Sequence, residues 1–479
     1  MRRLLGLAKR LLPADSAIGR FVRRLVPSAL ISPARRGYRR HVKNVEPGLW
    51  SPRVAQDRAN PLFSVVIPMF NTPERYLAPL VDSLINQSYP HFEAILADAS
   101  TDPGRAAAIK LHAGLDARLS YIRLNENRGI SANTNEGLSH ATAPFVAFVD
   151  HDDALALGAL NEVAARLAED PDIDVFYSDE DLLTEDGVRR KGPSFKPDWQ
   201  PHLLLNCNYT NHLSVVRRTL VDEIGGLRPD FDGAQDYDML LRLHSLGRTL
   251  RVVHIPLVLY HWREAAASTA KKLGYKAYAV DAGRRALAEY LRRVGVTAEI
   301  DDLPNQPSWF RIKPRWPASV AVVSAGEAAR LGAALQAATS TACQPTWLCQ
   351  PGGFEASAIP GDVAALVVLQ KPFAPSSPDW LDDLVGALAL PGATAVAPLL
   401  DNDDAGAVNP NVAAIRRLVE LDEKAFLWPD TLVHDAPSVP SSVVAVKTGD
   451  VDLLDAGRIS VPPERGRCVV WGPQRMVAQ

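Results

Sequence analysis

The chain has 479 residues, of which 47 % are hydrophobic and 22 % charged, values that are normal for a soluble globular protein. This length exceeds one ordinary core, so we expect two or three domains. The four cysteines lie at spacings that suit no zinc site and fit a reducing compartment, and no stretch reaches the roughly 18 apolar residues of a membrane-spanning helix.

The first 43 residues are strongly basic, although the whole chain has a net charge of −3. They carry twelve lysines and arginines and one acid, a net charge of +11. Apolar stripes within residues 4–12 and 18–26 repeat at helical spacing with arginines beside them, a pattern typical of helices on an anionic membrane surface. A disordered basic tail and a helix docked on the protein itself are the alternatives. No uninterrupted apolar segment follows the basic start, so we do not expect a secretory signal.

From Pro61 onward, short apolar strands alternate with amphipathic helices. Strands are predicted at 63–69, from Phe92, from Ser120 and from Phe145, and helices at 77–85, 105–115 and after Ile130. This alternation predicts an α/β domain whose mostly parallel sheet is covered on both faces. Ligands on such sheets bind beyond the carboxyl ends of the strands. The polar residues that follow the strands are Asn71, Asp98, Asn125, Asn127 and the acidic turn 150–153.

The acidic turn FVDHDD has metal-binding character. In an extended chain Asp150 and Asp152 lie on the same face, where two carboxylates repel unless a cation lies between them. A hard divalent cation with oxygen ligands would fit there and keep positions free for phosphate oxygens. Asp153 points elsewhere and could cap the next helix. A turn that only caps the helix is the alternative.

Two downstream residues are candidates for the same site. Asp236 lies at or near the start of a predicted helix, where it could act as a cap worth about 1 kcal/mol or as a general base. His261 ends the apolar run LVLYHWR, which follows the predicted strand RVVHI and Pro256. It could be a structural hydrogen-bonding residue or, beside an acidic site, a metal ligand.

Several motifs together resemble glycosyltransferase family 2, and most closely its bacterial members of surface-polysaccharide and O-antigen assembly, including rhamnosyltransferase-like enzymes. The family motifs are SVVIPMFN (64–71), ADASTD (97–102), NRGISANTNEGL (127–138), FVDHDD (148–153), GAQDYDMLLR (233–242) and LYHWR (259–263). The subgroup motifs are YSDEDLL (177–183), FKPDW (195–199) and NYTNHL (208–213). The resemblance implies a GT-A fold, a Rossmann-like α/β fold, and inverting transfer of a sugar from a nucleotide-sugar donor to an acceptor hydroxyl.

Carried over by position, the resemblance also implies roles for individual residues. Those expected around the nucleotide are Pro68, Asn71, Asp98, Arg128 and Asp150. Asp150 and Asp152 would bind Mn²⁺ or Mg²⁺ with His261 as a late ligand, and Asp236 would be the base. Those expected near the sugar or acceptor are Asp153, Lys196, Trp199, Asp238 and Arg263, with packing as the alternative for Lys196, Trp199 and Arg263. Ala97 replaces an aspartate and Gln235 a glutamate that many relatives carry.

The rest of the chain is predicted to hold a second copy of the family domain. After a helix at 275–294 and a Pro-rich linker, AALVVL and PDWL (378–381) resemble the strand and helix of the acidic motif. Gln370-Lys371-Pro372 stands where the acids should be, so this copy would be degenerate and non-catalytic. The predicted divisions are 1–60 (basic segment), 61–300 (catalytic domain), 301–318 (linker) and 319–479 (degenerate copy).

Two other functions are open at this point. A nucleotidyltransferase would usually open with a Gly-rich loop bearing a basic residue, which SVVIPMFNTP lacks. A non-catalytic carbohydrate-binding scaffold fits residues 305–479 but not the upstream acids. The expected partners are a nucleotide-sugar donor, a glycan or lipid-linked glycan acceptor and the anionic inner face of the cytoplasmic membrane, with no nucleic acid. The expected location is the cytoplasm or that membrane face. Asp98 fits uracil or thymine and does not exclude guanine.

Overall fold

The computed structural model describes residues 33–44, 46–54, 61–264, 277–303 and 306–324, and shorter stretches farther on. Those stretches are residues 336, 345–349, 362–369, 373–375, 380–391, 393–400, 433–436, 438–440, 443–447, 454–455, 458–460 and 467–478. The apolar stripes predicted within residues 4–26 and the Gln370-Lys371-Pro372 segment lie outside the described residues. No helix in the described part of the chain is long and apolar enough to cross a membrane.

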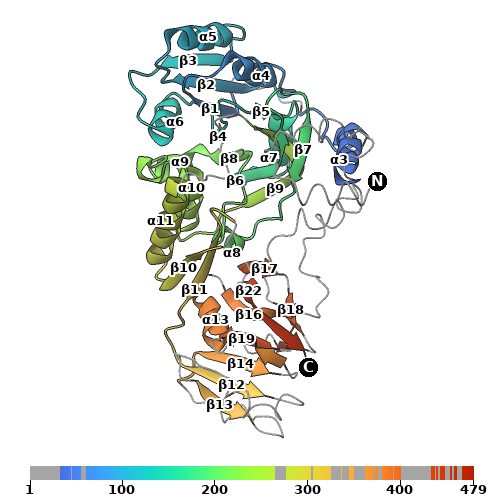
Figure 1. Ribbon diagram of the computed structural model, residues 1–479, viewed down its shortest axis with the longest axis vertical. Coiled ribbons are helices and arrows are strands. Elements are labelled where there is room, and N and C mark those ends of the chain that lie inside the picture. The colour runs from blue at the N-terminus through green and yellow to red at the C-terminus, as the bar shows by residue number, and fades with distance from the viewer. Residues whose placement is uncertain are drawn as a thin grey trace, which may run out of the picture.

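The first sheet has the order β3-β2-β1-β4-β8-β6-β9-β5, with β7 paired to β6 (Figure 1). Its strands are β1 (Phe63–Met69), β2 (Phe92–Asp98), β3 (Leu119–Arg123), β4 (Phe145–Phe148), β5 (Ala154–Leu155), β6 (Val175–Leu183), β7 (Arg190–Ser194), β8 (Ser214–Arg217) and β9 (Val252–Arg263). Strands β5, β7 and β8 run antiparallel to their neighbours, and the other strands are parallel to one another. The predicted α/β domain with a mostly parallel sheet is confirmed.

Helices cover both faces of this sheet, as the strand sequences require. They are α4 (Glu74–Ile85), α5 (Pro103–Ala113), α6 (Ile130–Ser139), α7 (Ala159–Glu169), α8 (Pro201–Leu204), α9 (Arg218–Glu223), α10 (Gln235–His244) and α11 (Ala277–Arg293). Phe63, Val65 and Ile67 of β1 pack with apolar residues of α4, α5 and α7. The alternate residue Val66 points to the other face, where Leu138 of α6 packs. Because both faces are buried, β1 is apolar almost throughout.

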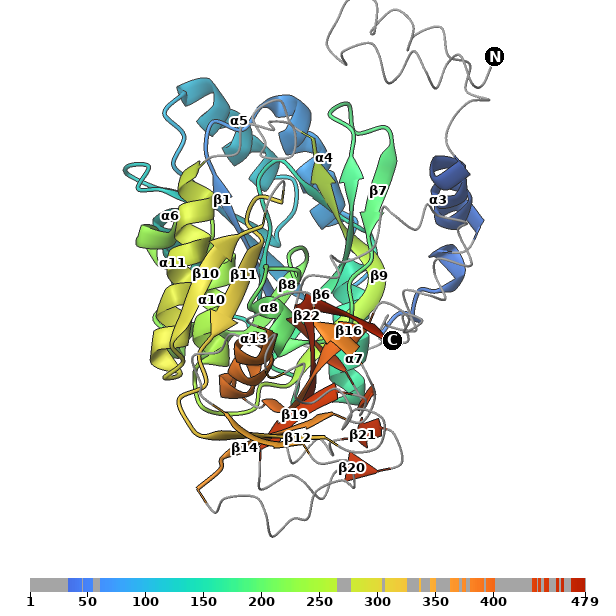
Figure 2. The ribbon, with the colours of Figure 1, turned by 60° about the horizontal axis from the view of Figure 1, so that its bottom comes forward.

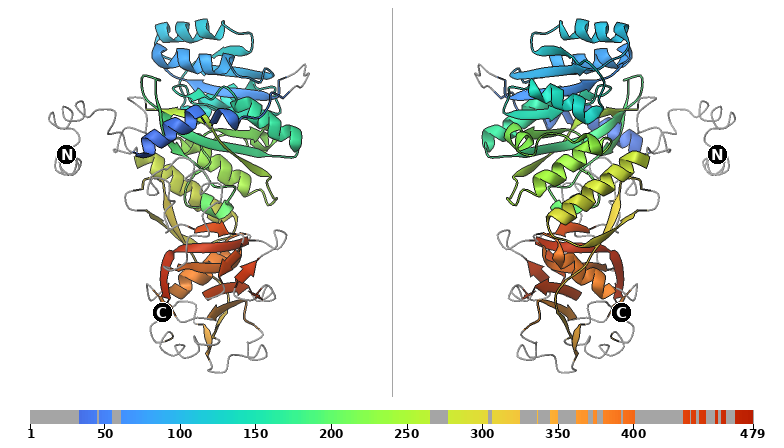
Figure 3. Two further views of the ribbon diagram at one scale, coloured as in Figure 1. Left: turned by 90° about the vertical axis from the view of Figure 1, so that its right-hand side faces the viewer. Right: turned by 90° about the vertical axis from the view of Figure 1, so that its left-hand side faces the viewer.

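The strands β9, β10 (Ala298–Asp302) and β11 (Phe310–Pro314) differ from the sequence prediction. The segments on either side of Pro256 form one strand, β9, whose register with β6 shifts after Ile255. A proline tolerated at such an irregularity does not end the strand. The expected Pro-rich linker contains β11, which pairs antiparallel with β10. This hairpin lies between the two sheets, which follow one another along the long axis (Figure 3).

Within the described residues, seven strands of the second sheet repeat the order of seven strands of the first. Its order is β13-β12-β14-β19-β16-β22-β15, with β17 paired to β22. These strands are β12 (Val320–Ser324), β13 (Thr346–Cys349), β14 (Ala365–Leu369), β15 (Phe373–Pro375), β16 (Ala393–Leu400), β17 (Val433–Ala436), β19 (Val443–Lys447) and β22 (Arg467–Ala478). The small third sheet holds β18 (Ser438–Pro440), β20 (Leu454–Asp455) and β21 (Arg458–Ser460).

The correspondence includes the direction of every matched pair. In the first sheet, β1 pairs parallel with β2 and β4, β8 pairs antiparallel with β4 and β6, and β9 pairs parallel with β6 and antiparallel with β5. The matching strands of the second sheet, β13-β12-β14-β19-β16-β22-β15, pair in the same directions. Helix α13 (Trp380–Gly386) follows β15 as α7 follows β5. The matched strands also come in the same order along the chain. Two unrelated domains would not be expected to share the order of their strands, the direction of each pairing and the connections between strands.

Part of the basic N-terminal segment is docked on the first domain. Helix α3 (Pro33–Asn44) lies beside β7 (Figure 2). The Tyr38 hydroxyl donates to Asp181 at 2.6 Å, and Arg190 contacts Asp181 at 2.6 Å and Glu46 at 2.7 Å. We call Tyr38, Glu46, Asp181 and Arg190 the docking cluster. Its two carboxylates are almost fully buried, and the Arg190 guanidinium pairs with both.

We expect Arg190→Met to lower the free energy of unfolding by about 3–5 kcal/mol, because the change leaves Asp181 and Glu46 buried without their cation. Urea denaturation would measure the difference. The exposed neighbour Arg189 provides the control, since Arg189→Met removes the same charge from a solvated position. An equal effect of both substitutions would mean that the docking cluster contributes no more than surface charge.

Candidate active site

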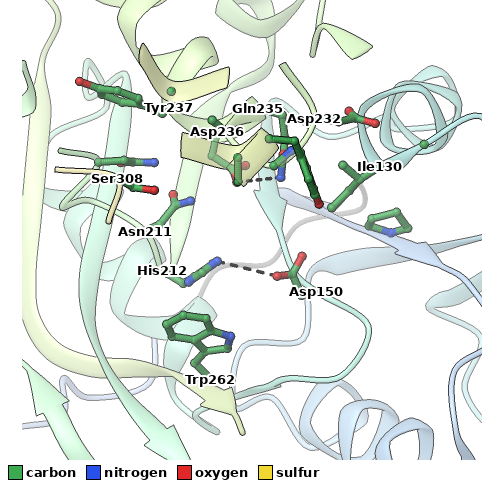
Figure 4. A pocket seen from close by; sticks show the side chains of 18 of the residues that line it. Ile130, Asp150, Asn211, His212, Asp232, Gln235, Asp236, Tyr237, Trp262 and Ser308 are labelled. Carbon is green, nitrogen blue, oxygen red and sulfur yellow. Dashed lines mark hydrogen bonds and ion pairs between the residues drawn. The ribbon is translucent and has the colours of Figure 1, made fainter. Parts of the chain in front are cut away.

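A cavity of about 820 Å³ opens at the carboxyl ends of β1, β4 and β6. Figure 4 shows side chains from distant parts of the chain converging on it. Its polar lining comes from the segments 127–133, 150–152, 207–212 and 232–236, together with Glu180 and Ser194. Pro68, Trp262, Tyr278 and residues 307–310 add mostly apolar surface. Asp150 and Asp152, which follow a strand, and Asp236, which lies at the start of a helix, therefore line one cavity.

The acidic turn after β4 presents two carboxylates to the cavity, those of Asp150 and Asp152. Its backbone is held by β9, because the Asp150 N–H donates to the Tyr260 hydroxyl at 3.1 Å and Arg263 Nε donates to the Asp152 carbonyl at 2.7 Å. Burial, and in part the negative charge of Asp150, raise the pKa of Asp152. A bound cation would relieve this excess of negative charge.

The donor set fits a divalent cation that shares its coordination with substrate. No group of three or more His, Cys, Asp or Glu side chains in the described residues forms a complete metal site. Mg²⁺ is commonly held by one or two carboxylates, with phosphate oxygens and water filling the remaining positions. Asp150 and Asp152 supply such a pair at the cavity wall.

The segment before β8 contributes two residues that the sequence prediction did not assign. His212 Nδ1 lies 3.1 Å from Glu180, and its Nε2 lies 3.9 Å from Asp150. The imidazole stacks on Tyr260 with ring centroids 4.6 Å apart. Its neighbour Asn211 accepts a hydrogen bond from Ser214 at 3.1 Å and forms a side-chain hydrogen bond with Asp236. One dipeptide thus connects the acidic turn with the predicted base.

Asp236 lies in the first turn of α10 and faces the cavity. Gln235 Nε2 donates to its carboxylate at 3.1 Å, and the same Gln235 accepts from the Gly233 N–H at 2.8 Å (Figure 4). Gln235, which stands where many relatives carry glutamate, therefore supplies an amide that orients the Asp236 carboxylate. Burial and the charge of Asp150 raise the pKa of Asp236 to about 6, while His212 and Asn211 act in the opposite direction. A carboxylate with this pKa can accept a proton near neutral pH.

The predicted nucleotide residues divide into two groups. Pro68 and Asp150 line the cavity, whereas Asn71, Asp98 and Arg128 lie outside its lining. Asp98 is fully buried and accepts hydrogen bonds from Ser100, Tyr121 and Arg123. Asn71 ties the end of β1 to residues 100–102, and Arg128 pairs with Glu136 on the surface. A nucleotide role for these three stays a prediction.

A role for His261 as a metal ligand stays a prediction. His261 Nδ1 lies 2.7 Å from Asp181 of the docking cluster, and His261 is absent from the cavity lining. The neighbouring Trp262 faces the cavity instead, because successive side chains of a strand point to opposite faces. His151 within the acidic turn and His212 both line the cavity.

The five predicted sugar or acceptor residues also lie outside the cavity lining. Asp153 is fully buried and accepts hydrogen bonds from Tyr260 and from the Arg263 N–H at 2.6 and 2.7 Å. Lys196 is buried and donates to the His212 carbonyl at 2.6 Å. Asp238 is buried between Arg228 and Arg242. Arg263 supports the acidic turn, and Trp199 packs against the core. A sugar or acceptor role for these five residues stays a prediction.

Comparisons with known proteins show the family of the chain. Residues 64–225 match the family model Glycosyl transferase family 2. The O-antigen biosynthesis protein RfbC of Myxococcus xanthus is 37 % identical over 265 residues, 55 % of this chain and 20 % of that protein. The putative glycosyltransferase EpsE of Bacillus subtilis is 33 % identical over 208 residues, 43 % of this chain and 68 % of that protein.

Among solved structures, S. aureus TarS 1–349 in complex with UDP-GlcNAc is 22 % identical, with a TM-score of 0.37. The match covers 48 % of this chain and 72 % of that chain. The chain spans only 30 % and 20 % of the length of two of its curated relatives.

Proposed function

The chain belongs to glycosyltransferase family 2, and we propose that its first domain is an inverting, metal-dependent glycosyltransferase of bacterial cell-surface polysaccharide assembly. The acceptor would be a hydroxyl of a glycan or lipid-linked glycan, and the donor a nucleotide-sugar. The observation that carries the proposal is the combination of a paired acidic turn with a separate, partly buried carboxylate in one cavity.

The charge of the cavity supports metal dependence. Five acids line it, namely Asp150, Asp152, Glu180, Asp232 and Asp236, whereas the described residues contribute neither lysine nor arginine to the lining. A diphosphate would be repelled by this surface unless a cation compensated the charge. When bound, Mn²⁺ or Mg²⁺ held by Asp150 and Asp152 would stabilise the charge of the leaving diphosphate.

With Asp236 as the one base, the mechanism would be inverting. Asp236 accepts the proton of the acceptor hydroxyl, whose oxygen forms a bond to the anomeric carbon. The bond from that carbon to the diphosphate oxygen breaks, and its electron pair leaves with the nucleoside diphosphate. One displacement from the face opposite the leaving group inverts the anomeric centre.

The test is release of nucleoside diphosphate by the full chain from a panel of UDP-, dTDP- and GDP-sugars, with Mn²⁺ and glycoside acceptors. We expect release from at least one donor and loss of that release with EDTA. Pyrophosphate release from a nucleoside triphosphate and a sugar 1-phosphate would instead indicate the nucleotidyltransferase alternative. Absence of metal-dependent release from every donor would overturn the proposal.

A pH profile tests the assignment of the base more closely. We expect kcat to fall below about pH 6, because protonated Asp236 cannot accept a proton. Asn211→Ala should move this acid limb to higher pH, since it removes a hydrogen bond that favours the carboxylate. Asn208, which also lines the cavity, serves as the control through Asn208→Ala. An acid limb unmoved by Asn211→Ala would contradict the coupling of Asn211 to the base.

We also propose that residues 319–479 are a second, non-catalytic copy of the same fold. The matched order, direction and connection of the strands support this interpretation. The expected membrane contact rests on the charge of residues 1–43, and the exposed side chains of Arg40 and Lys43 on docked α3 are compatible with it. A location at the inner membrane face therefore stays part of the proposal.

A further inference from the structure

One wall of the cavity comes from outside the segment matched by the family model. Tyr278 and Gly283 of α11 and residues 307–310, which lead into β11, line the cavity, whereas the match ends at residue 225. We call Tyr278, Ser308 and Trp309 the far wall. Figure 4 shows Asp236 between Asp150 on one side and Asn211 and Ser308 on the other. The predicted base therefore lies between the acidic turn and the far wall.

The far wall is anchored to the helix that carries the base. Phe310 is fully buried, and its ring lies parallel to that of Tyr237, the residue after Asp236, with centroids 6.5 Å apart. The Phe310 N–H donates to the Asn206 carbonyl at 2.8 Å, and the Trp309 carbonyl accepts from the Leu303 N–H at 3.0 Å. These contacts hold residues 307–310 at a fixed position relative to Asp236.

Two backbone features indicate that the far wall has a specific conformation. Ser308 adopts a φ of 62°, a left-handed conformation that is uncommon for residues other than glycine and clusters at functional sites. Gly233, three residues before Asp236, has a φ of 91°, and a Cβ there would lie 2.6 Å from Tyr278 Cε2. The glycine thus permits the close approach of Tyr278 to the loop that leads into the base. Tyr278 remains 52 % exposed, so its ring is accessible.

We propose that the far wall is the acceptor subsite and takes a pyranose ring of the acceptor glycan, with one of its hydroxyls directed at Asp236. This inference rests on the proposed function. An aromatic ring offers a flat apolar face to the C–H groups of a pyranose, and the Ser308 and Asn211 side chains can hydrogen-bond its hydroxyls. The acidic residues of the cavity lie mainly around the acidic turn and the base, whereas the far wall is neutral. A neutral wall suits an uncharged sugar ring.

The test separates the kinetics of the acceptor from those of the donor. The probes are p-nitrophenyl α- and β-pyranosides of glucose, galactose, mannose, rhamnose and N-acetylglucosamine, used with the donor found for the full chain. We expect Trp309→Ala to raise the KM for the pyranoside about ten-fold while the donor KM changes less than two-fold. Tyr278→Ala, at an exposed position, should raise the acceptor KM in the same direction without a loss of thermal stability.

Trp347→Ala is the matched control, because Trp347 packs against the core and does not line the cavity. It should leave the acceptor KM unchanged. An acceptor KM unaffected by both Trp309→Ala and Tyr278→Ala would overturn the inference, and so would the absence of any stimulation of nucleotide release by pyranosides. Failure of the proposed function is distinguishable, since the unaltered chain would then release no nucleotide from any donor.

Discussion

Asp236→Asn should lower kcat for sugar transfer by about 10²–10⁴-fold, the contribution typical of a positioned general base. The amide is nearly isosteric with the carboxylate and keeps the hydrogen-bonding distance to Gln235 Nε2 or Asn211, but it cannot take the acceptor proton. Donor binding should change little, because Asp236 acts on the acceptor. Steady-state release of nucleoside diphosphate with saturating donor and acceptor would measure the loss.

The cavity offers a control for the change of charge itself. Asp232 also lines the cavity, and its carboxylate accepts from the Ser131 N–H at 3.1 Å at the start of α6. Asp232→Asn removes one negative charge and retains an acceptor for that N–H, so kcat should fall by much less than ten-fold. If Asp236→Asn kept more than a tenth of the wild-type kcat, Asp236 could not be the principal base.

The first half of the catalytic sheet was predictable because its signals are local. The run FSVVIPM is apolar at successive positions, as a strand buried on both faces must be, and it forms β1 with the predicted bounds. Strands β5 and β8 have two and four residues, too short for a periodic pattern, and they gain their stability from pairing with β9, β4 and β6. Such pairing depends on residues far apart in the sequence.

Asp150 and Asp152 were predictable from their position after a strand and Asp236 from its place at a helix start, whereas the position of His212 near Asp150 was not. The order of residues in LYHWR does not reveal which of His261 and Trp262 faces the cavity, since the answer depends on the register of β9 against β5 and β6. That register points His261 toward Asp181. His212 gave one signal, its place in the subgroup motif NYTNHL, but only the folded chain brings it beside Asp150.

The sequence does not show which polar residues near a site motif are held by contacts within the protein. Lys196, Asp238 and Arg263 are all buried and engaged with backbone or with opposite charges. A sequence shows a charged residue but not its partner. The partner determines whether the side chain lies at the surface, binds a ligand or is buried in the core. The far wall was not predictable from the sequence, because Tyr278 and Trp309 lie in segments without a recognisable motif.

Asp152→Asn should raise the Mn²⁺ concentration for half-maximal activity by at least about ten-fold, and Asp150→Asn,Asp152→Asn together should abolish the response to metal. Each substitution removes a hard oxygen ligand with its charge, and the pair leaves the cavity wall without an ionised metal ligand on the acidic turn. Titration of transfer activity with Mn²⁺ and Mg²⁺ after removal of metal by EDTA would measure the change.

Thermal unfolding gives a second measure of the same site that does not depend on turnover. A ligand that binds only the folded state stabilises it by RT ln(1 + [L]/Kd), about 2.7 kcal/mol at a hundred-fold excess over Kd. The wild-type chain should therefore show a Tm that rises with Mn²⁺, and more so with nucleoside diphosphate present. The double substitution removes the mutual repulsion of the two carboxylates, so it should not lower the metal-free Tm. An equal Mn²⁺-induced rise in both proteins would locate the cation elsewhere than the acidic turn.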